Sequence, residues 1–448
     1  MSNNIVLKKG LNIPLAGVPA LVVKRTILPD TVAVQPSDYK GLNARLLVRE
    51  GDKVLAGSPV LADKKNPDVL VTSPVSGTVK AVVRGDKRKL LAVLVDADKD
   101  QEYLDFGAAK DSLSAEDVKD KLLKSGLWAA IVQRPYGIMA DPAVTPKAIF
   151  VSAFSTAPLA ADTEFTLGNE TAALQAGVSA LAKLAKVHVS VKSADSAFAK
   201  LRDAEIHVVK GKHPAGNVGV QISHICPIRK EETVWTVSPA LLAAIGRLFT
   251  TGRYDVRRKV AVGGPAANEP AYIDTLPGIP MSELKAFYVS ADGIRIISGD
   301  VLSGTNAGEN GYLGFYDTQV TLLKEGTEPE LLGWARPFRF NQYSADHSYF
   351  NWCLGRLDKE VAMDTNLHGG PRAFVMPDSY YAKHLPMDIY PLYLVKACLA
   401  GDIDNMEKFG IYEVLPEDLA LVEFMDPSKN YVQDIIQNGI DLMLKEMA

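Results

Sequence analysis

Hydrophobic residues in the first hundred positions fall into short runs that are separated by turns. The runs are rich in Val and Leu, and turn-forming residues interrupt them roughly every 8–12 positions. Clear turn signals stand at 15–17, 50–52, 66–68 and 84–86. This rhythm is typical of short strands in a barrel or sandwich, and we expect such a module over residues 1–105.

The pattern changes to alternating strands and helices between residues 106 and 257. Ser114 and Asp117 form a helix-start signal, and Leu174, Val178 and Leu181 lie on one face of a predicted helix. Strands are predicted over 148–151, 187–191 and 206–209, and helices over 114–125, 171–186 and 241–250. Strand–helix–strand alternation favours a parallel sheet, so we predict an α/β domain over 106–257.

Short strands return in a β-rich module over residues 258–335. They are predicted over 259–264, 287–290, 294–297, 318–323 and 331–334. The C-terminal region, 336–448, opens with an aromatic stretch at 338–352 and becomes helical from about residue 388. The aromatic stretch is either a docking surface for a membrane partner or ordinary core packing, because aromatic residues are enriched in the cores of interfaces as well.

Composition and charge exclude several classes of function for this chain. The 448 residues include 49 basic and 53 acidic side chains, a net charge of −4, which gives no electrostatic footprint for nucleic acid or an anionic membrane surface. No apolar run reaches the length of a signal-peptide core or a transmembrane helix. We therefore expect a soluble, non-exported chain that reaches a membrane only through a partner.

Cysteine and histidine usage argues against metal centres. Cys226, Cys353 and Cys398 are widely spaced and odd in number, which argues against a disulfide framework and fits a reducing compartment. Three thiolates are too few for a four-cysteine iron–sulfur cluster within the chain. The seven histidines show no metal-ligand spacing, so no metal site is predicted.

Residues 48–82 resemble the half-barrel that carries biotin or lipoate on a lysine. Lys64 and Lys65 lie between two predicted strands, but no methionine flanks them and Pro67 follows closely. The pair also falls early between the strands, whereas a carrier lysine sits at the tip of the hairpin. We interpret the module as a fixed barrel with a charged surface hairpin and no attachment site.

Signatures for nucleotide or flavin binding are missing from the sequence. No segment matches the G-x-G-x-x-G or G-x-x-x-x-G-K-[ST] phosphate loops, and Gly263-Gly264 runs into Pro265, which lacks the N–H that a phosphate needs. The run from Asp300 to Asn306 is close to a motif in which flavin is linked through phosphate to a final threonine, but Asn306 has no hydroxyl. We interpret that run as a β-turn, and the α/β domain as a fold without its nucleotide.

Two further segments combine polar and aromatic residues that suit a ring-shaped ligand. Arg134 and Tyr136 lie within an apolar run at 128–137, and His213 and His224 belong to a Gly/Pro-rich segment and its continuation. The alternatives are a buried anchor between domains for the first segment, and histidines that cap backbone carbonyls for the second.

Several characteristic segments stand in one order along the whole chain. They are IVLKKGLNIPLAG (5–17), DKKNP (63–67), SPVSGTV (73–79), SGLWAA (125–130), GKHPAGNVG (211–219), RIISGDVLSGT (295–305), LLGWARP (331–337), LPMDIYPLYLV (385–395) and PEDLALVEF (416–424). In these segments the chain resembles the family formed by the A subunit of the Na+-translocating NADH:quinone oxidoreductase, the NQR complex. It departs from the family at Asp426, where a cysteine often precedes the proline, so no redox role is carried over to that position.

The resemblance implies a peripheral subunit on the cytoplasmic face of the bacterial inner membrane. The family's six-subunit complex passes electrons from NADH to ubiquinone or a related quinone and exports Na+, using FAD, FMN, iron–sulfur centres and riboflavin in other subunits. This subunit would bind no redox cofactor itself and would have no complete active site alone. Its partners would be the other five subunits, chiefly the membrane-embedded B subunit and the flavin-bearing C subunit. The residues for quinone binding would be Arg134, Tyr136, His213 and His224.

The resemblance also implies the fold in more detail. It assigns a barrel-sandwich module to 1–105, a Rossmann-like domain to 106–257, a β-grasp module of the soluble-ligand-binding type to 258–335 and a helical region to 336–448. Similar folds occur in the NADH- and FMN-binding subunit of respiratory complex I and in the soluble subunit of the Rnf complex. Those relatives hold FMN with a Gly-rich loop and a cluster with cysteines, and this sequence lacks both. The alternatives that remain are an NADH/FMN-binding dehydrogenase subunit, or else a structural scaffold without a ligand.

Overall fold

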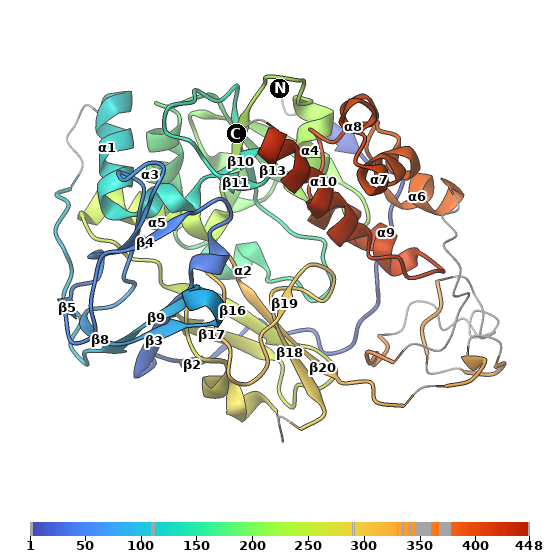
Figure 1. Cartoon of the computed structure of the whole chain (residues 1–448), viewed down its shortest axis with the longest axis horizontal. Helices are drawn as coiled ribbons and strands as arrows, with labels where there is room; N and C mark the ends of the chain where they lie inside the picture. Colours follow the sequence, from blue (N-terminus) through green and yellow to red (C-terminus); the bar gives the residue numbers. More distant parts are fainter. Residues whose placement is uncertain are drawn as a thin grey trace.

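The strands of the protein form four sheets, with a group of C-terminal helices packed beside them (Figure 1). The computed structural model describes residues 3–108, 113–288, 290, 292–328, 330–333, 336–339, 342–345, 360–366 and 378–446. Within these residues, no helix is both long enough and apolar enough to cross a membrane.

A seven-stranded sheet organises the α/β region, in the order β1-β14-β13-β12-β15-β10-β11. Its first five strands run parallel, whereas β10 is antiparallel to β15 and β11. The strands are β1 (Asn3–Val6), β10 (Val132–Arg134), β11 (Ile138–Met139), β12 (Ile149–Ser152), β13 (Val187–Val191), β14 (Ala204–Lys210) and β15 (Val234–Thr236). The three strands predicted in this region are confirmed as β12, β13 and β14.

Helices cover both faces of this sheet. Ile149 and Val151 pack in the core that includes α3 (Thr171–Leu181) and α5 (Pro239–Thr251), whereas Phe150 between them packs with Ile222 of α4 (Val218–Ile225) on the other face. This alternation follows from the two-residue repeat of a strand. The helix α1 (Ala115–Ser125) begins where predicted, because Ser114 and Asp117 each accept the backbone N–H of the other. The remaining helix of this region is the short α2 (Thr163–Leu167).

A six-stranded sheet lies below the α/β region in Figure 1, in the order β19-β18-β20-β16-β17-β2. Its strands are β2 (Val23–Thr26), β16 (Arg258–Gly263), β17 (Ala271–Thr275), β18 (Ile294–Ser298), β19 (Thr305–Asn306) and β20 (Gln319–Lys324). Two predicted strands are wrong. The predicted strand at 287–290 begins at the last residue of a 3-10 helix, η5 (Met281–Phe287). In this helix Met281, Leu284 and Phe287 are buried, at the three-residue spacing of a 3-10 helix. At 331–333 the described residues form a turn rather than a strand.

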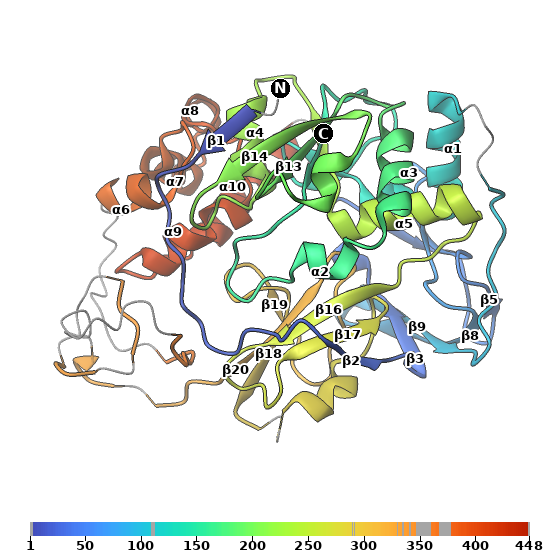
Figure 2. The same cartoon turned by 180° about the vertical axis from the view of Figure 1, so that it is seen from behind.

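The barrel-sandwich module consists of a four-stranded sheet, β3-β9-β8-β5, and a three-stranded sheet, β4-β6-β7. Its strands are β3 (Thr31–Val34), β4 (Ala44–Leu46), β5 (Lys53–Val54), β6 (Pro59–Asp63), β7 (Leu70–Thr72), β8 (Gly77–Arg84) and β9 (Leu90–Ala97). The chain before β3 belongs to other sheets. Figure 2 shows β1 beside β14 and the N-terminal trace running on to β2 beside β17. The N-terminal segment therefore ties the α/β sheet to the six-stranded sheet.

The C-terminal region is helical, as predicted from about residue 388. Its helices are α6 (Asp378–His384), α7 (Pro391–Ala400), α8 (Ile403–Phe409), α9 (Ala420–Met425) and α10 (Val432–Glu446), with a 3-10 turn, η8 (Pro416–Leu419), before α9. They share a hydrophobic core that also takes in Val209 of β14 and Val220 of α4, so these helices pack against the α/β region. Most of the aromatic stretch at 338–352 lies outside the described residues.

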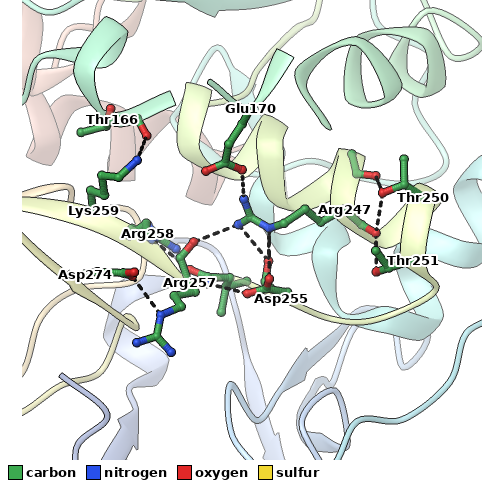
Figure 3. A network of polar contacts seen from close by, with 12 residues as sticks. Thr166, Glu170, Arg247, Thr250, Thr251, Asp255, Arg257, Arg258, Lys259 and Asp274 are labelled. Atoms are coloured by element: carbon green, nitrogen blue, oxygen red, sulfur yellow. Dashed lines mark hydrogen bonds and ion pairs between the residues drawn. The ribbon is translucent and has the colours of Figure 1, made fainter. Parts of the chain in front are cut away.

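The connection from α5 to β16 is held by a polar network (Figure 3). Arg247 of α5 bonds Glu170 at 2.5 Å through Nη1, and its Nη2 donates to the carbonyl oxygens of Asp255 and Arg257. From the other side, Lys259 of β16 donates to the carbonyl oxygen of Thr166 at 2.7 Å. These bonds join the α/β region to the six-stranded sheet.

Candidate functional site

A cavity of about 440 Å³ opens beyond the carboxyl ends of β12 and β15. The strand order reverses at this point, because β13 and β14 lie on one side of β12 and β15 lies on the other. Ligands of open α/β sheets bind in the crevice at such a switch point. The lining comes from the barrel module (38–40), the α/β region (130–157 and 213–239), the six-stranded-sheet module (300–316) and the C-terminal helices (415–420). The cavity is therefore the place where all parts of the chain meet.

Polar residues follow the two strands directly and form one wall of the cavity. Ser152 and Ser155 come at and after the end of β12, and Thr236 and Ser238 come at and after the end of β15. Ser238 also caps α5, since its side chain accepts the backbone N–H of Leu241. These four residues were not predicted from the sequence as site residues. They could have been found from the polar residues that stand at the end of each parallel strand and directly after it.

The opposite wall includes the turn that begins at Asp300. The carboxylate of Asp300 accepts the backbone N–H groups of Leu302 and Ser303, at 2.8 and 3.1 Å. All three residues line the cavity. The interpretation of this run as a turn is confirmed for residues 300–304, whereas Thr305 and Asn306 form strand β19; its place in the cavity wall was not predicted.

His213 lines the cavity and is almost fully buried. The hydroxyl oxygen of Thr156 accepts the N–H of Gly216 at 2.9 Å, so its proton is available to Nδ1 of His213 at 3.2 Å. Nε2 of the ring has no partner among the described residues. Burial lowers the pKa of His213, so the ring is neutral at neutral pH. His213 thus presents a buried ring nitrogen without a partner to the cavity.

Arg134 also lines the cavity, but carboxylates occupy its guanidinium. Nη1 lies 2.8 Å from Oδ2 of Asp418, and Nη2 lies 2.5 Å from Oε1 of Glu417. Asp418 in turn accepts the N–H of Leu415 at 3.0 Å. Arg134 therefore fixes η8 of the C-terminal region onto strand β10, in agreement with the interpretation of this segment as a buried anchor.

The other two predicted residues lie away from the described lining of the cavity. Tyr136 is buried, with its ring edge-on to Tyr412 at 6.4 Å between centroids. His224 is exposed on α4, where its Nδ1 lies 2.8 Å from the carbonyl oxygen of Val220. For His224 the structure agrees with the carbonyl-capping interpretation. The fold thus brings Arg134 and His213 to one cavity, and leaves Tyr136 and His224 outside it.

Asp38 brings a titratable group to the barrel side of the cavity. Its Oδ2 accepts the N–H of Phe315 at 2.9 Å. Burial, and to a lesser extent the nearby charge of Asp317, raise the pKa of Asp38 to about 7, although the bond from Phe315 opposes the shift. The charge of the cavity wall therefore changes near neutral pH.

The lysine pair of the barrel module lies in the turn after β6, outside the described lining of the cavity. Lys64 and Lys65 are both exposed. The carboxylate of Asp63 accepts the N–H groups of Asn43 and Asn66 and so holds the turn in place. The structure agrees with a charged surface hairpin.

Three family models match successive regions of this chain. Residues 5–98 match the NqrA N-terminal barrel-sandwich hybrid domain, residues 113–254 the NqrA second alpha/beta domain, and residues 259–309 the NQRA C-terminal domain. The chain is 38% identical to the A subunit of the Na(+)-translocating NADH-quinone reductase of Serratia proteamaculans over 99% of this chain and 100% of that protein. Identity to the corresponding proteins of Yersinia pestis (95% of this chain, 96% of that protein) and Haemophilus influenzae (99% and 100%) is 39% and 36%. The chain therefore belongs to the NqrA family, which is the A subunit of the Na+-translocating NADH-quinone reductase.

Proposed function

We propose that this chain works as the peripheral, cytoplasmic-face subunit of a six-subunit, Na+-exporting NADH:quinone oxidoreductase. The proposal rests on family membership over nearly the whole chain. In it, the chain docks chiefly on the membrane-embedded B subunit and the flavin-bearing C subunit, and the complex reduces ubiquinone or a related quinone. The strand order β14-β13-β12-β15 matches the first four positions, 3-2-1-4, of the Rossmann order, which supports a Rossmann-like domain. We extend the proposal to a β-grasp fold for the β16–β20 module.

We further propose that the cavity at the β12–β15 switch point receives the head group of a quinone. The observation that carries this step is Nε2 of His213, which is buried in the cavity wall without a partner among the described residues. A buried polar atom without a partner lowers stability by roughly 1–3 kcal/mol, and with its proton on Nε2 the ring would donate to a quinone carbonyl oxygen and so relieve this penalty.

The size and lining of the cavity suit such a ligand. Its volume of about 440 Å³ lies within the usual range for small-molecule sites, which combine an apolar wall with a few polar groups. The apolar contacts come from Val132, Met139, Phe154, Leu302 and Leu415. Arg134 would act on the ligand mainly by holding the C-terminal wall in place, because Asp418 and Glu417 occupy its two terminal nitrogens.

In this proposal, the electron-transfer cofactors are bound by other subunits of the complex. Cys226 lies in the small core beside α4 and Cys398 in the core of the C-terminal helices, so these two thiols belong to separate clusters. Cys353 lies outside the described residues. The rival assignment, an NADH- and FMN-binding dehydrogenase subunit, requires a Gly-rich phosphate loop that the sequence lacks.

A fluorescence titration of the purified chain with a short-chain ubiquinone tests the cavity. Trp128 and Trp235 lie edge-on at 5.3 Å and precede the cavity residues Ala130 and Thr236. We expect saturable quenching in the wild type and in Ser303→Ala, and binding at least about tenfold weaker in Ser303→Phe, whose ring would fill the exposed rim. Equal affinity in all three proteins would place the quinone elsewhere. Saturable binding of FMN or NADH instead would favour the rival assignment.

A further inference from the structure

A second group of polar side chains lies on strands β13 and β14, away from the cavity. Nδ1 of His188 lies 2.9 Å from Nε2 of His207 and 3.3 Å from Oε2 of Glu205, and the last two atoms are 4.0 Å apart. His188 and Glu205 stand near the amino ends of their strands, whereas the cavity lies beyond the carboxyl ends of β12 and β15. The two sites are therefore at opposite ends of the sheet.

The register of the two strands brings these three residues to one face. His188 pairs with Glu205, and Ser190 pairs with His207. Paired residues of neighbouring strands point to the same side, and so do residues two apart in one strand. The sequence shows only E-x-H in one segment and a histidine 17 residues before Glu205, which is why no metal-ligand spacing was found.

The arrangement of donor atoms matches what a divalent transition metal needs. Bonds of about 2.0–2.1 Å at tetrahedral angles set donor atoms about 3.3 Å apart, and the three measured separations lie on both sides of that value. Two imidazoles and one carboxylate are also a ligand set that proteins use for zinc with one position left open. Small rotations of the side chains would be enough to complete the geometry.

The surroundings hold the ligands and leave an entry. The side chains of His188 and His207 are 7% and 3% exposed, and Phe150 stacks on the His188 ring at 4.9 Å. Glu205 is 52% exposed, which leaves a path from solvent. Lys186 binds the carboxylate of Glu205 through Oε1 at 2.7 Å, so Oε2 remains directed at the histidines.

We propose that His188, Glu205 and His207 form a binding site for a divalent transition metal of the zinc class. The metal would bridge β13 and β14 through Nδ1 of His188, Nε2 of His207 and Oε2 of Glu205. A water molecule would take the open fourth position on the exposed side.

One feature of the site limits its affinity. Metal binding through Nε2 of His207 requires the ring proton on Nδ1, and Nδ1 is buried without a partner among the described residues. Proteins normally give that N–H an acceptor, and losing such a partner weakens metal binding about 10–100-fold. We therefore expect exchangeable binding that is weaker than in a closed structural zinc site.

The test uses the full chain without an affinity tag, stripped of metal with a chelator. Co2+ is titrated and followed by visible absorption, which reports tetrahedral coordination, and Zn2+ is then added in competition. We expect one equivalent to bind to the wild type, with affinity at least about tenfold lower in Glu205→Ala and in His207→Gln. Zn2+ should also raise the melting temperature of the wild type and not that of His207→Gln.

His224→Gln is the matched control, because it removes an exposed imidazole on α4. It should bind the metal as the wild type does. Glu205→Ala changes an exposed side chain and keeps the test valid if His207→Gln fails to fold. The proposal is overturned by no binding in the wild type, by unchanged affinity in Glu205→Ala, or by binding that disappears with His224→Gln.

Discussion

Arg134 and Asp418 are 284 positions apart in the chain, yet their side chains meet at 2.8 Å and both are almost completely buried. Arg134 ends strand β10 of the α/β sheet, and Asp418 lies in the 3-10 turn that precedes α9. Gly219 makes this contact possible, because a Cβ atom at 219 would overlap both charged groups. The ion pair therefore fixes the C-terminal helices at the rim of the cavity.

Removing Asp418 should destabilise the chain strongly. In Asp418→Ala, the buried guanidinium of Arg134 keeps only Glu417, whose side chain is 46% exposed. Breaking a buried ion pair from one side costs about 3–5 kcal/mol. Glu417→Ala is the matched control, and its loss should be smaller, because the Glu417 side chain is 46% exposed and Arg134 keeps its bond to Asp418. Urea unfolding followed by tryptophan fluorescence measures the unfolding free energy of both variants. Equal losses of stability would contradict the assignment of the anchor to Asp418.

The raised pKa of Asp38 predicts a pH dependence of stability. Its pKa is about 7 in the folded chain, against a usual value of 3.8, so the folded state retains a proton that the unfolded state loses between these values. Asp38 therefore lowers stability progressively as the pH rises from about 4 to 7, and the loss is complete above 7.

Asp38→Asn removes this ionisation and keeps an acceptor for the N–H of Phe315. The variant should match the wild type at pH 4 and exceed its unfolding free energy by roughly 4 kcal/mol at pH 8. Burial also raises the pKa of Glu413 to about 7, so the informative quantity is the difference between the two proteins at each pH. A constant difference from pH 4 to pH 8 would show that Asp38 does not carry the effect.

The strands and helices that could be predicted are those whose own residues show a hydrophobic pattern or a capping motif. β13, in which three valines alternate with His188 and Ser190, was predicted as a strand, and α1 was predicted from the capping pair Ser114 and Asp117. The sheet partners of β1 and β2 could not be predicted, because edge strands of four residues contain no information about the strand that they join. For the candidate site, Arg134 and His213 were identified by residue type. The turn at Asp300 and the serines after β12 and β15 depend on contacts between distant segments.

Arg247 should be sensitive even to a change that preserves its charge. Its guanidinium bonds Glu170 and the carbonyl oxygens of Asp255 and Arg257 at once, whereas a lysine has one nitrogen and cannot reach all three (Figure 3). We expect Arg247→Lys to lose about 1–3 kcal/mol of stability and to speed proteolysis within 252–257. Arg253→Lys, an exposed arginine in the same segment, should leave both quantities unchanged. Cleavage rates that rise equally in both variants would contradict a specific role for Arg247.

Gly246 should not tolerate alanine, although alanine favours helices. At this position α5 crosses α3 so closely that a Cβ atom would overlap the carbonyl oxygen of Ala173. The gain in helix propensity is about 1 kcal/mol, but α3 and α5 would have to separate, and overpacking typically costs about 1–3 kcal/mol. We expect a net loss for Gly246→Ala in thermal or urea unfolding. Thr250→Ala, one turn later on the exposed side, should change stability by less than about 0.5 kcal/mol. A stabilised Gly246→Ala would mean that the two helices are not held at this distance.

Because we propose that the redox cofactors belong to other subunits, we expect the purified chain to be colourless and to carry no covalently attached group. Asn306 stands where a flavin-bearing motif has threonine, and it lies in the two-residue strand β19, so its amide offers no site for a phosphoester. Lys64 and Lys65 belong to a turn that Asp63 holds by two backbone bonds, which does not suit a swinging arm. The visible spectrum should therefore show no flavin or iron–sulfur band, and the intact mass should equal that of the unmodified chain. An absorption band that persists through gel filtration would move the chain towards the dehydrogenase assignment, and a mass increase of one biotinyl or lipoyl group would restore the carrier interpretation of the barrel.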